Sequence, residues 1–188
     1  MEAWEKAAHE MRACTRCHLA GTRKNVVILR GSARPVVLFL GEAPGRKEDE
    51  TGKPFTGSSG KVLDRAIAEL ELGEGDYGIT NVFMCRPPGN VFDRAAATAC
   101  RPWLELKLSM MDPKVIVPLG QHALDSIIGE KRPIVKAAGQ VIRWRGKAVF
   151  PLIHPAATFR RVAYAKRWTE DLRKLKSYLE SIHGAPEP

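Results

Sequence analysis

The sequence lacks the features that mark several protein classes. No apolar run approaches the ~20 residues needed to span a bilayer, and residues 1–6 do not show the basic-then-apolar pattern of a secretory leader. We therefore expect a soluble, intracellular, cytoplasmic protein that does not associate with membranes. No internal repeat and no linker divides the 188 residues, of which 44% are hydrophobic. This composition supports a substantial core, and we expect a single domain over residues 1–188 that acts as a monomer.

Two glycine-rich nucleotide-binding motifs are also missing. The sequence holds no Gly-x-Gly-x-x-Gly, so dinucleotide binding has no support. The nearest approach to a phosphate-binding P-loop is the segment 57–61, which is two residues short between its glycines. Val62 also stands where that motif requires Ser or Thr. A P-loop enzyme is therefore not expected.

Positive charge is present in excess and is unevenly distributed. The formal net charge is +9, with 14 Lys and Arg against 13 Asp and Glu in residues 1–100, but 16 against 8 in residues 101–188. The excess in the second half indicates a basic face directed toward a polyanion. A solvated surface of high pI explains the same count equally well, so charge alone does not decide between the two.

Apolar runs alternate with helical patterns along the chain, which predicts an α/β fold. We expect three layers, α/β/α, with a central, mainly parallel four-stranded sheet. The run 26–29 predicts an edge strand, residues 140–144 the first arm of a hairpin, and the tail after Gly184 is expected to fray. Core strands are expected at 35–40, 78–85, 114–120 and 147–153, and helices at 2–13, 58–70, 94–111, 121–128 and about 164–182.

The long loop 41–57, which follows the first core strand, is the most informative stretch. It carries several acids, among them Glu42 and Glu48, and one aromatic residue, Phe55. Open α/β sheets bind ligands at the carboxyl ends of their strands, and a connection this long is more often functional than idle. Ser58 or Ser59 is placed to cap the helix that follows. We therefore expect the loop to border the functional site.

Two further polar residues stand at strand ends. Asn81 lies within an apolar strand, where intrinsic propensity disfavours it. His154 directly follows another strand and precedes Pro155, which favours an extended conformation. A hydrogen-bonded structural role is the commoner one for a single histidine. The shared position of Glu42, Asn81 and His154 at strand ends favours a site instead.

All four cysteines can be explained by one metal centre. Two form a Cys-x-x-Cys pair, one follows a strand, and one lies early in a helix; they are Cys14, Cys17, Cys85 and Cys100. In an intracellular protein such cysteines are more often metal ligands than disulfides. Four thiolates suit tetrahedral zinc or an iron–sulfur cluster, and their spacing does not separate the two. Buried apolar thiols and a redox dithiol are the remaining interpretations, but a dithiol leaves the two distant cysteines unexplained.

Together these motifs resemble the family 4 uracil-DNA glycosylases, the iron–sulfur branch of the uracil-DNA glycosylase superfamily. The resemblance extends from Cys14 to the last helix, with every motif in order. Two stretches depart from the family pattern: the segment 56–60, where the family more often has Val-Gly-x-Ala-Gly, and the segment 158–160. The matching motifs are Gly41-Glu42-Ala43-Pro44-Gly45, Gly52-Lys53-Pro54-Phe55-Thr56-Gly57, Asn81-Val82, Cys85-Arg86-Pro87-Pro88-Gly89-Asn90, Pro118-Leu119-Gly120 and His154-Pro155-Ala156.

The resemblance implies an enzyme that flips uracil out of single- or double-stranded DNA and hydrolyses its N-glycosidic bond. Such a reaction leaves an abasic site in base excision repair. Phe55 is then the face on which uracil stacks, and Asn81 reads the uracil edge. His154 stabilises the negative charge of the departing base, and Glu42 orients or activates the attacking water.

The remaining assignments also follow from the resemblance. Glu48 is expected to shape the pocket near uracil C5, and Asn90 to assist near the water or a phosphate. Gly41 and Ala43 complete the uracil pocket. The four cysteines are implied to hold a 4Fe-4S cluster, with zinc as the alternative. The implied DNA-binding residues are Arg160, Arg161, Lys166 and Arg167.

Three other functions compete with this interpretation. A non-catalytic, zinc-containing nucleic-acid-binding module explains the charge and the cysteines, but not the polar residues at strand ends. A glycosylase relative that forms a covalent adduct with DNA carries an inserted basic loop, and the sequence between Cys85 and Cys100 has none. An electron-transfer protein would be expected to cycle its cluster during turnover.

Overall fold

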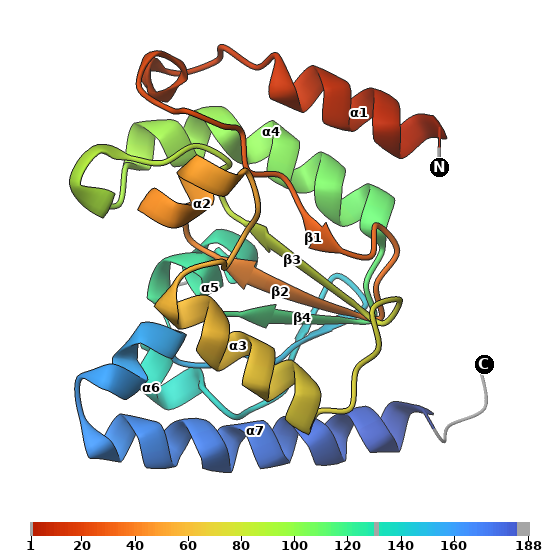
Figure 1. Cartoon of the computed structure of the whole chain (residues 1–188). Coiled ribbons are helices and arrows are strands. Elements are labelled where there is room, and N and C mark those ends of the chain that lie inside the picture. Colours follow the sequence, from red (N-terminus) through yellow and green to blue (C-terminus); the bar gives the residue numbers. More distant parts are fainter. Residues whose placement is uncertain (1, 130–131, 184–188) are drawn as a thin grey trace.

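Strands and helices alternate along the chain, and the strands form one central sheet (Figure 1). The computed structural model describes residues 2–129 and 132–183. Within these residues the sheet has six strands in the order β1-β3-β2-β4-β6-β5. Their bounds are Arg30–Gly31 for β1, Val37–Gly41 for β2, Tyr77–Asn81 for β3, Val115–Pro118 for β4, Ile142–Trp144 for β5 and Lys147–Val149 for β6.

The sheet is parallel at its centre and antiparallel at both edges. Strands β3, β2, β4 and β6 pair in parallel, whereas β1 pairs antiparallel with β3, and β5 with β6. The predicted α/β fold with a mainly parallel sheet is therefore confirmed. The predicted count of four strands is wrong for the described residues, because a short antiparallel strand is added at each edge. The edge strand expected at 26–29 is also displaced, since pairing with β3 begins only at Arg30.

Helices cover both faces of the sheet, because apolar side chains project from both faces of its strands and pack against apolar helix surfaces. Val37 and Phe39 face α3 and α7, whereas Leu38 and Leu40 face α4 and α5, as the alternation of a strand requires. Helix α1 packs outside α4 (Figure 1). The helix bounds are Glu2–Arg12 for α1, Arg46–Thr51 for α2, Ser58–Glu69 for α3, Arg94–Met111 for α4, Gln121–Ile128 for α5, Ile134–Ala137 for α6 and Val162–His183 for α7.

The long loop after β2 is more ordered than its sequence suggests. It contains the short helix α2, which ends at Gly52 in a left-handed conformation. The predicted serine cap of α3 is wrong, because Gly57 is the N-cap residue and Ser58 is already helical. Short 3-10 helices occur at His18–Gly21 (η1), Pro88–Asn90 (η2) and Pro155–Phe159 (η3). The tail predicted to fray after Gly184 lies outside the described residues.

Parallel pairing brings several strand ends to one edge of the sheet. Gly41 at the end of β2 is in register with Asn81 at the end of β3. Leu40 is in register with Pro118 of β4, and beyond that strand Leu119 pairs with Leu152. The residues that follow these ends therefore surround one region. Among the described residues, no helix is both long and apolar enough to cross a membrane.

Candidate active site

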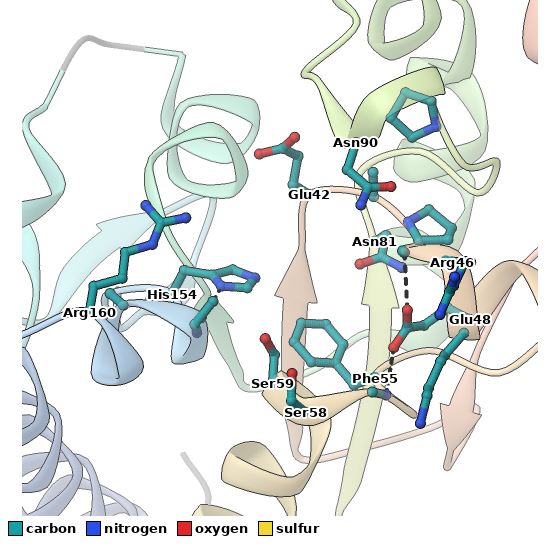
Figure 2. Close-up of a pocket in the computed structure, with 18 residues that line it drawn as sticks. Glu42, Arg46, Glu48, Phe55, Ser58, Ser59, Asn81, Asn90, His154 and Arg160 are labelled. Atoms are coloured by element: carbon teal, nitrogen blue, oxygen red, sulfur yellow. Dashed lines mark hydrogen bonds between the residues drawn. The ribbon is translucent and has the colours of Figure 1, made fainter.

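The carboxyl ends of the parallel strands border a pocket of about 710 Å³ (Figure 2). Figure 2 shows Glu42 and Asn90 on one side of this space and Phe55 on the other, with His154 facing Asn81 across it. Ala43 and Glu48 also line the pocket. The structure thus brings together side chains from four separate segments of the chain.

Gly41 is required where β2 reaches the pocket. A Cβ atom at this position would lie 2.4 Å from Asn81 Oδ1 and 2.6 Å from the Phe55 ring. Only a glycine allows both side chains to approach the strand so closely. Gly41 therefore lies behind Asn81 and Phe55, the two residues that were predicted to contact uracil, and does not itself line the pocket.

The Asn81 amide is the most unusual polar group of the site. Asn81 is 1% exposed, and its Oδ1 atom is the one buried side-chain oxygen or nitrogen of the described residues that has no hydrogen-bond partner. Buried polar atoms are almost always paired, and a lone exception calls for an explanation. Because Asn81 lines the pocket, a bound ligand with an N–H donor would satisfy this oxygen.

Phe55 is held in a strained conformation by its neighbours. Its φ angle is +52°, in the left-handed region that a Phe rarely adopts. The Phe55 carbonyl accepts a hydrogen bond of 2.9 Å from Arg30 Nη1, and Arg30 also pairs with Asp64 of α3. A Cβ on Gly60 would lie 1.8 Å from the Phe55 carbonyl oxygen, so helix α3 packs directly on the loop. The ring lies 6.1 Å from the His154 ring, between centroids.

The Glu48 carboxylate fastens the loop on both sides of Phe55. Its Oε2 atom accepts a hydrogen bond of 3.1 Å from the Gly45 N–H at the start of α2. Its Oε1 atom accepts from the N–H groups of Thr56 and Gly57, at 2.9 and 2.8 Å, directly before α3. The sequence predicted that Glu48 shapes the pocket near a base. The contacts show a carboxylate that joins the two helices flanking Phe55.

His154 has a defined tautomer. Its Nδ1 atom accepts a hydrogen bond of 3.1 Å from the Ala156 N–H, so the neutral ring carries its proton on Nε2. Burial, assisted by the positive charge of Arg160, lowers the pKa of His154 to about 4. The ring is therefore a neutral hydrogen-bond donor at physiological pH. Gly120 leaves room for it, since a Cβ there would lie 3.2 Å from the His154 Cβ.

Glu42 and Asn90 line the side of the pocket that faces Phe55 (Figure 2). Burial raises the pKa of Glu42 above its ordinary value, and the nearby His122 partly opposes this shift. Asn90 has a φ angle of +55°, and its Oδ1 accepts a hydrogen bond of 2.9 Å from Arg86 Nε. Its side chain is thus held at the rim by the Pro-rich turn that the sequence predicted.

Several pocket residues were missed by sequence reasoning. Ser58 and Ser59 were considered only as caps, yet both line the pocket from the first turn of α3. Arg46 and Lys47 of α2 line it as well. These two basic residues lie in the loop 41–57, which was expected to border the site, and that position was the signal that could have identified them. His122 gave no local signal, because only the fold brings it near Glu42.

The four cysteines are free thiols in the described structure, and Cys85 and Cys100 lie close enough to other cysteines of the set to be affected by their charge. Burial raises the pKa of Cys85 to about 11 and that of Cys100 in the same direction; the neighbouring cysteines add to both shifts. Two donors point at this group: Trp103 Nε1 lies 3.2 Å from Cys14 Sγ, and Arg23 Nη1 lies 3.5 Å from Cys85 Sγ. Among the described residues, no group of three or more His, Cys, Asp or Glu side chains is arranged to hold a metal ion.

The four predicted DNA-binding residues divide into two groups. Arg160, Arg161 and Lys166 are exposed, and Arg160 also lines the pocket. Arg167 is different, because its Nε donates to Asp171 at 2.6 Å and its Nη2 to the Ala138 carbonyl at 2.7 Å. The Arg167 side chain is 36% exposed, so a phosphate contact at this residue would compete with these two hydrogen bonds.

Two large apolar side chains flank the exposed arginines. Phe159 is 60% exposed and Val162 is 88% exposed. They lie where η3 passes into α7, next to Arg160 and Arg161. The sequence analysis did not single them out, although apolar residues in a basic loop are the signal that could have done so.

Comparisons of the sequence with known proteins identify its family. The family model described as "Uracil DNA glycosylase superfamily" matches residues 29–176. A type-4 uracil-DNA glycosylase of Sulfurisphaera tokodaii is 38% identical over 94% of this chain and 84% of its own length. A type-4 uracil-DNA glycosylase of Thermotoga maritima is 36% identical over 95% and 96%. A type-5 uracil-DNA glycosylase of Thermus thermophilus is 32% identical over 66% and 71%.

Proposed function

The chain belongs to the uracil-DNA glycosylase superfamily and to its type-4 branch, and we propose that it removes uracil from DNA. In this proposal the uracil nucleotide is flipped out of single- or double-stranded DNA into the pocket. Hydrolysis of its N-glycosidic bond then leaves an abasic site for base excision repair. The observation that carries the proposal is the buried, unpartnered Oδ1 atom of Asn81 at the pocket.

Asn81 accounts for recognition of uracil. Its Oδ1 accepts from uracil N3–H, while its amide nitrogen donates to uracil O4. Cytosine presents an acceptor at N3 and a donor at N4, so each of these bonds would be replaced by a repulsive contact. Because Asn81 is buried, its amide could not form hydrogen bonds with water in place of those that cytosine fails to make. Cytosine is therefore strongly rejected. Phe55 supplies the stacking face, a contact that contributes roughly 1–3 kcal/mol.

His154 and Glu42 account for the bond cleavage. When the N1–C1′ bond breaks, its electron pair leaves with uracil, and positive charge develops on the sugar. The Nε2–H of neutral His154 donates to uracil O2 and stabilises the anion without becoming charged itself. Glu42 orients a water for attack on C1′ and accepts its proton, and its carboxylate also favours the cationic sugar.

We propose that the four cysteines hold a 4Fe-4S cluster. The proposal rests on the resemblance to the iron–sulfur branch and on the donor set, since four thiolates suit such a cluster; tetrahedral zinc is the alternative. When bound, the cluster supplies a rigid link between the N-terminal segment, the residues after β3 and helix α4.

The cofactor proposal can be checked on the purified protein. We expect a brown preparation with iron and acid-labile sulfide and with visible absorption typical of iron–sulfur proteins. A colourless protein with stoichiometric zinc would contradict the cluster and leave the ligands in place.

The basic loop after His154 is proposed to hold the DNA. Arg160, Arg161 and Lys166 are exposed and close in sequence to the pocket, so phosphates beside a flipped nucleotide lie within their reach. The exposed Phe159 ring and Val162 methyl groups are suited to contact the bases that remain stacked in the DNA beside the flipped nucleotide.

One incubation tests the activity. The protein is mixed with a labelled oligonucleotide that contains one uracil, and alkali then cuts the strand at any abasic site. We expect cleavage at the uracil position and none in matched strands with cytosine or thymine there. The His154→Ala variant, with normal folding and iron content, should lose uracil release. Intact uracil strands after incubation would instead favour a non-catalytic nucleic-acid-binding module.

A further inference from the structure

One buried side chain joins the cysteine-bearing helix to the uracil pocket. Lys107 lies in α4, the helix that carries Cys100, and it is 0% exposed. Its Nζ donates to Thr80 Oγ1 at 2.7 Å and to the Asn81 backbone carbonyl at 2.9 Å. A fully buried lysine is rare, and the contact with Asn81 places this one directly behind the base-reading residue.

The Asn81 carbonyl depends on Lys107 because the sheet offers it no strand partner. Strand β1 pairs with β3 only at Gly78 and Ile79, and because the two strands are antiparallel, Asn81 lies beyond Arg30, where β1 begins. On the other edge of β3, the hydrogen bond to β2 is made by Val82 N–H and the Gly41 carbonyl. Lys107 therefore fixes the backbone from which the Asn81 amide projects.

A second network reinforces this position. Thr80, which accepts from Lys107, donates its own hydroxyl proton to the Ile28 carbonyl at 2.6 Å. Ile28 belongs to the chain between the Cys-x-x-Cys segment and β1. Lys107 of α4 is thus hydrogen-bonded to the end of β3 and, through Thr80, is linked to the segment that contains Ile28.

The buried charge of Lys107 needs a partner of opposite sign, and cysteine thiolates bound to a metal centre would supply it. No carboxylate forms an ion pair with it among the described residues, and an unpaired buried charge is strongly unfavourable. Cys100 lies seven residues earlier on the same face of α4. Long helical side chains lean toward the helix N-terminus, which is the side of Lys107 on which Cys100 lies. In agreement, burial lowers the pKa of Lys107 to about 8, and Cys100 acts against this shift.

We propose that Lys107 is a positioning residue that pairs with the negative charge of the four-cysteine centre and holds Asn81 in place to read uracil. This inference rests on the proposed function, because it uses both the cluster and the role of Asn81. It assigns to the centre an effect on base recognition in addition to its structural link.

The test compares Lys107→Met, which keeps a similar length without charge or donors, with the parent protein. Leu104→Met is the matched control, since Leu104 is also fully buried in α4 and lies in the same apolar cluster as Cys85, so the exchange changes packing there but no charge. Lys107→Gln is the second variant in case the methionine protein does not fold. Iron content and thermal unfolding are recorded for each.

The first measurement is the dissociation constant for DNA containing an uncleavable 2′-fluorinated deoxyuridine, beside that for DNA with an abasic site. We expect Lys107→Met to bind the uracil analogue about 10-fold more weakly, which corresponds to about 1.4 kcal/mol, and to bind abasic DNA like the parent. If Lys107 had a purely structural role, the variant would bind both DNAs more weakly, or would bind both like the parent. Leu104→Met should match the parent on both.

The second measurement is the midpoint potential of the cluster, which does not depend on glycosylase activity. A buried cation stabilises the more negative, reduced form, so its removal should shift the potential to a more negative value in both Lys107 variants. The control should keep the parental potential.

The outcomes separate this inference from the proposed function. A parent that releases uracil and holds iron, with Lys107 variants of parental potential or parental uracil binding, would overturn the inference alone. A parent that holds iron but releases no uracil would overturn the proposed function, and with it the recognition role of Lys107. A parent without iron would overturn both the cofactor and this inference.

Discussion

Burial shifts two side chains of the pocket, Glu42 and His154, toward their neutral forms, with different consequences for each. A neutral His154 is the form that donates to the leaving uracil, so the lowered pKa of this ring favours catalysis. A neutral Glu42 cannot accept a proton or stabilise a cation, so its raised pKa restricts the pH range of activity. The same desolvation therefore aids one residue and limits the other.

The pH dependence of uracil release should be governed by Glu42. His154 remains neutral as pH falls until about 4, whereas Glu42 becomes protonated at its raised pKa, above the ordinary 4.5. Activity should therefore be constant near neutrality and fall as pH drops through the Glu42 pKa. Glu42→Gln should lower the single-turnover rate about 100-fold and remove this acid limb. Single-turnover rates between pH 4.5 and 8.5 measure both effects; an unchanged limb in the variant would contradict the assignment.

A single methyl group at Gly41 should disable recognition. In Gly41→Ala the new Cβ would clash with Asn81 Oδ1 and with the Phe55 ring at once. Both contacts with uracil are then displaced, and we expect kcat/KM to fall at least 10-fold, or about 1.4 kcal/mol. Gly21→Ala is the control, because a Cβ there meets no atom within 4 Å. Equal kinetics for the two variants would show that the close packing at Gly41 is not needed.

At the scale of elements, the site depends on how two helices are joined across one loop. Helix α2 has six residues and α3 begins at Ser58. Neither N-terminus receives a serine or threonine cap. The Glu48 carboxylate accepts from the backbone at both ends, so one side chain fixes the segment that presents Phe55.

Removing the Glu48 charge should loosen this segment. In Glu48→Gln, one acceptor oxygen is replaced by an N–H₂ group that faces backbone N–H donors. Hydrogen bonds to a charged group contribute roughly 1.5–3 kcal/mol, so we expect a loss of about 2 kcal/mol in unfolding free energy and a higher KM for uracil DNA. Glu50→Gln is the control, as its pair with Arg46 is exposed and long, at 3.9 Å. Urea denaturation with steady-state kinetics checks the prediction; a stable variant of parental KM would contradict it.

The elements also show which parts of the site could be predicted from the sequence. Glu42, Asn81 and His154 follow apolar strands, and parallel pairing brings such ends together, so their convergence was predictable. Helix α2 and the role of Glu48 were not, because a six-residue helix has little periodicity and its capping partner lies across the loop. Lys107 gave no signal at all. Its burial becomes visible only when α4 is placed against β3.

Over the whole molecule, positive charge is concentrated in the second half of the chain, but not all of it is available to DNA. Arg160, Arg161 and Lys166 are exposed beside the pocket. Arg167 lies on the same helix as Lys166 yet neutralises Asp171, which is 0% exposed and also pairs with Lys174. A count of basic residues therefore overstates the DNA-binding surface.

The salt dependence of DNA binding should distinguish an arginine that contacts phosphate from one that pairs with Asp171. Removal of one phosphate contact should reduce the slope of log affinity against log salt by about 1, so Arg161→Ala should bind DNA more weakly and with a shallower slope. Arg167→Ala should leave the slope unchanged and lower the unfolding free energy by roughly 2 kcal/mol, because Asp171 keeps only Lys174 as a partner. Fluorescence anisotropy between 50 and 200 mM salt, together with urea denaturation, measures both variants. A shallower slope for Arg167→Ala would show that this partly exposed arginine contacts a phosphate in addition to Asp171.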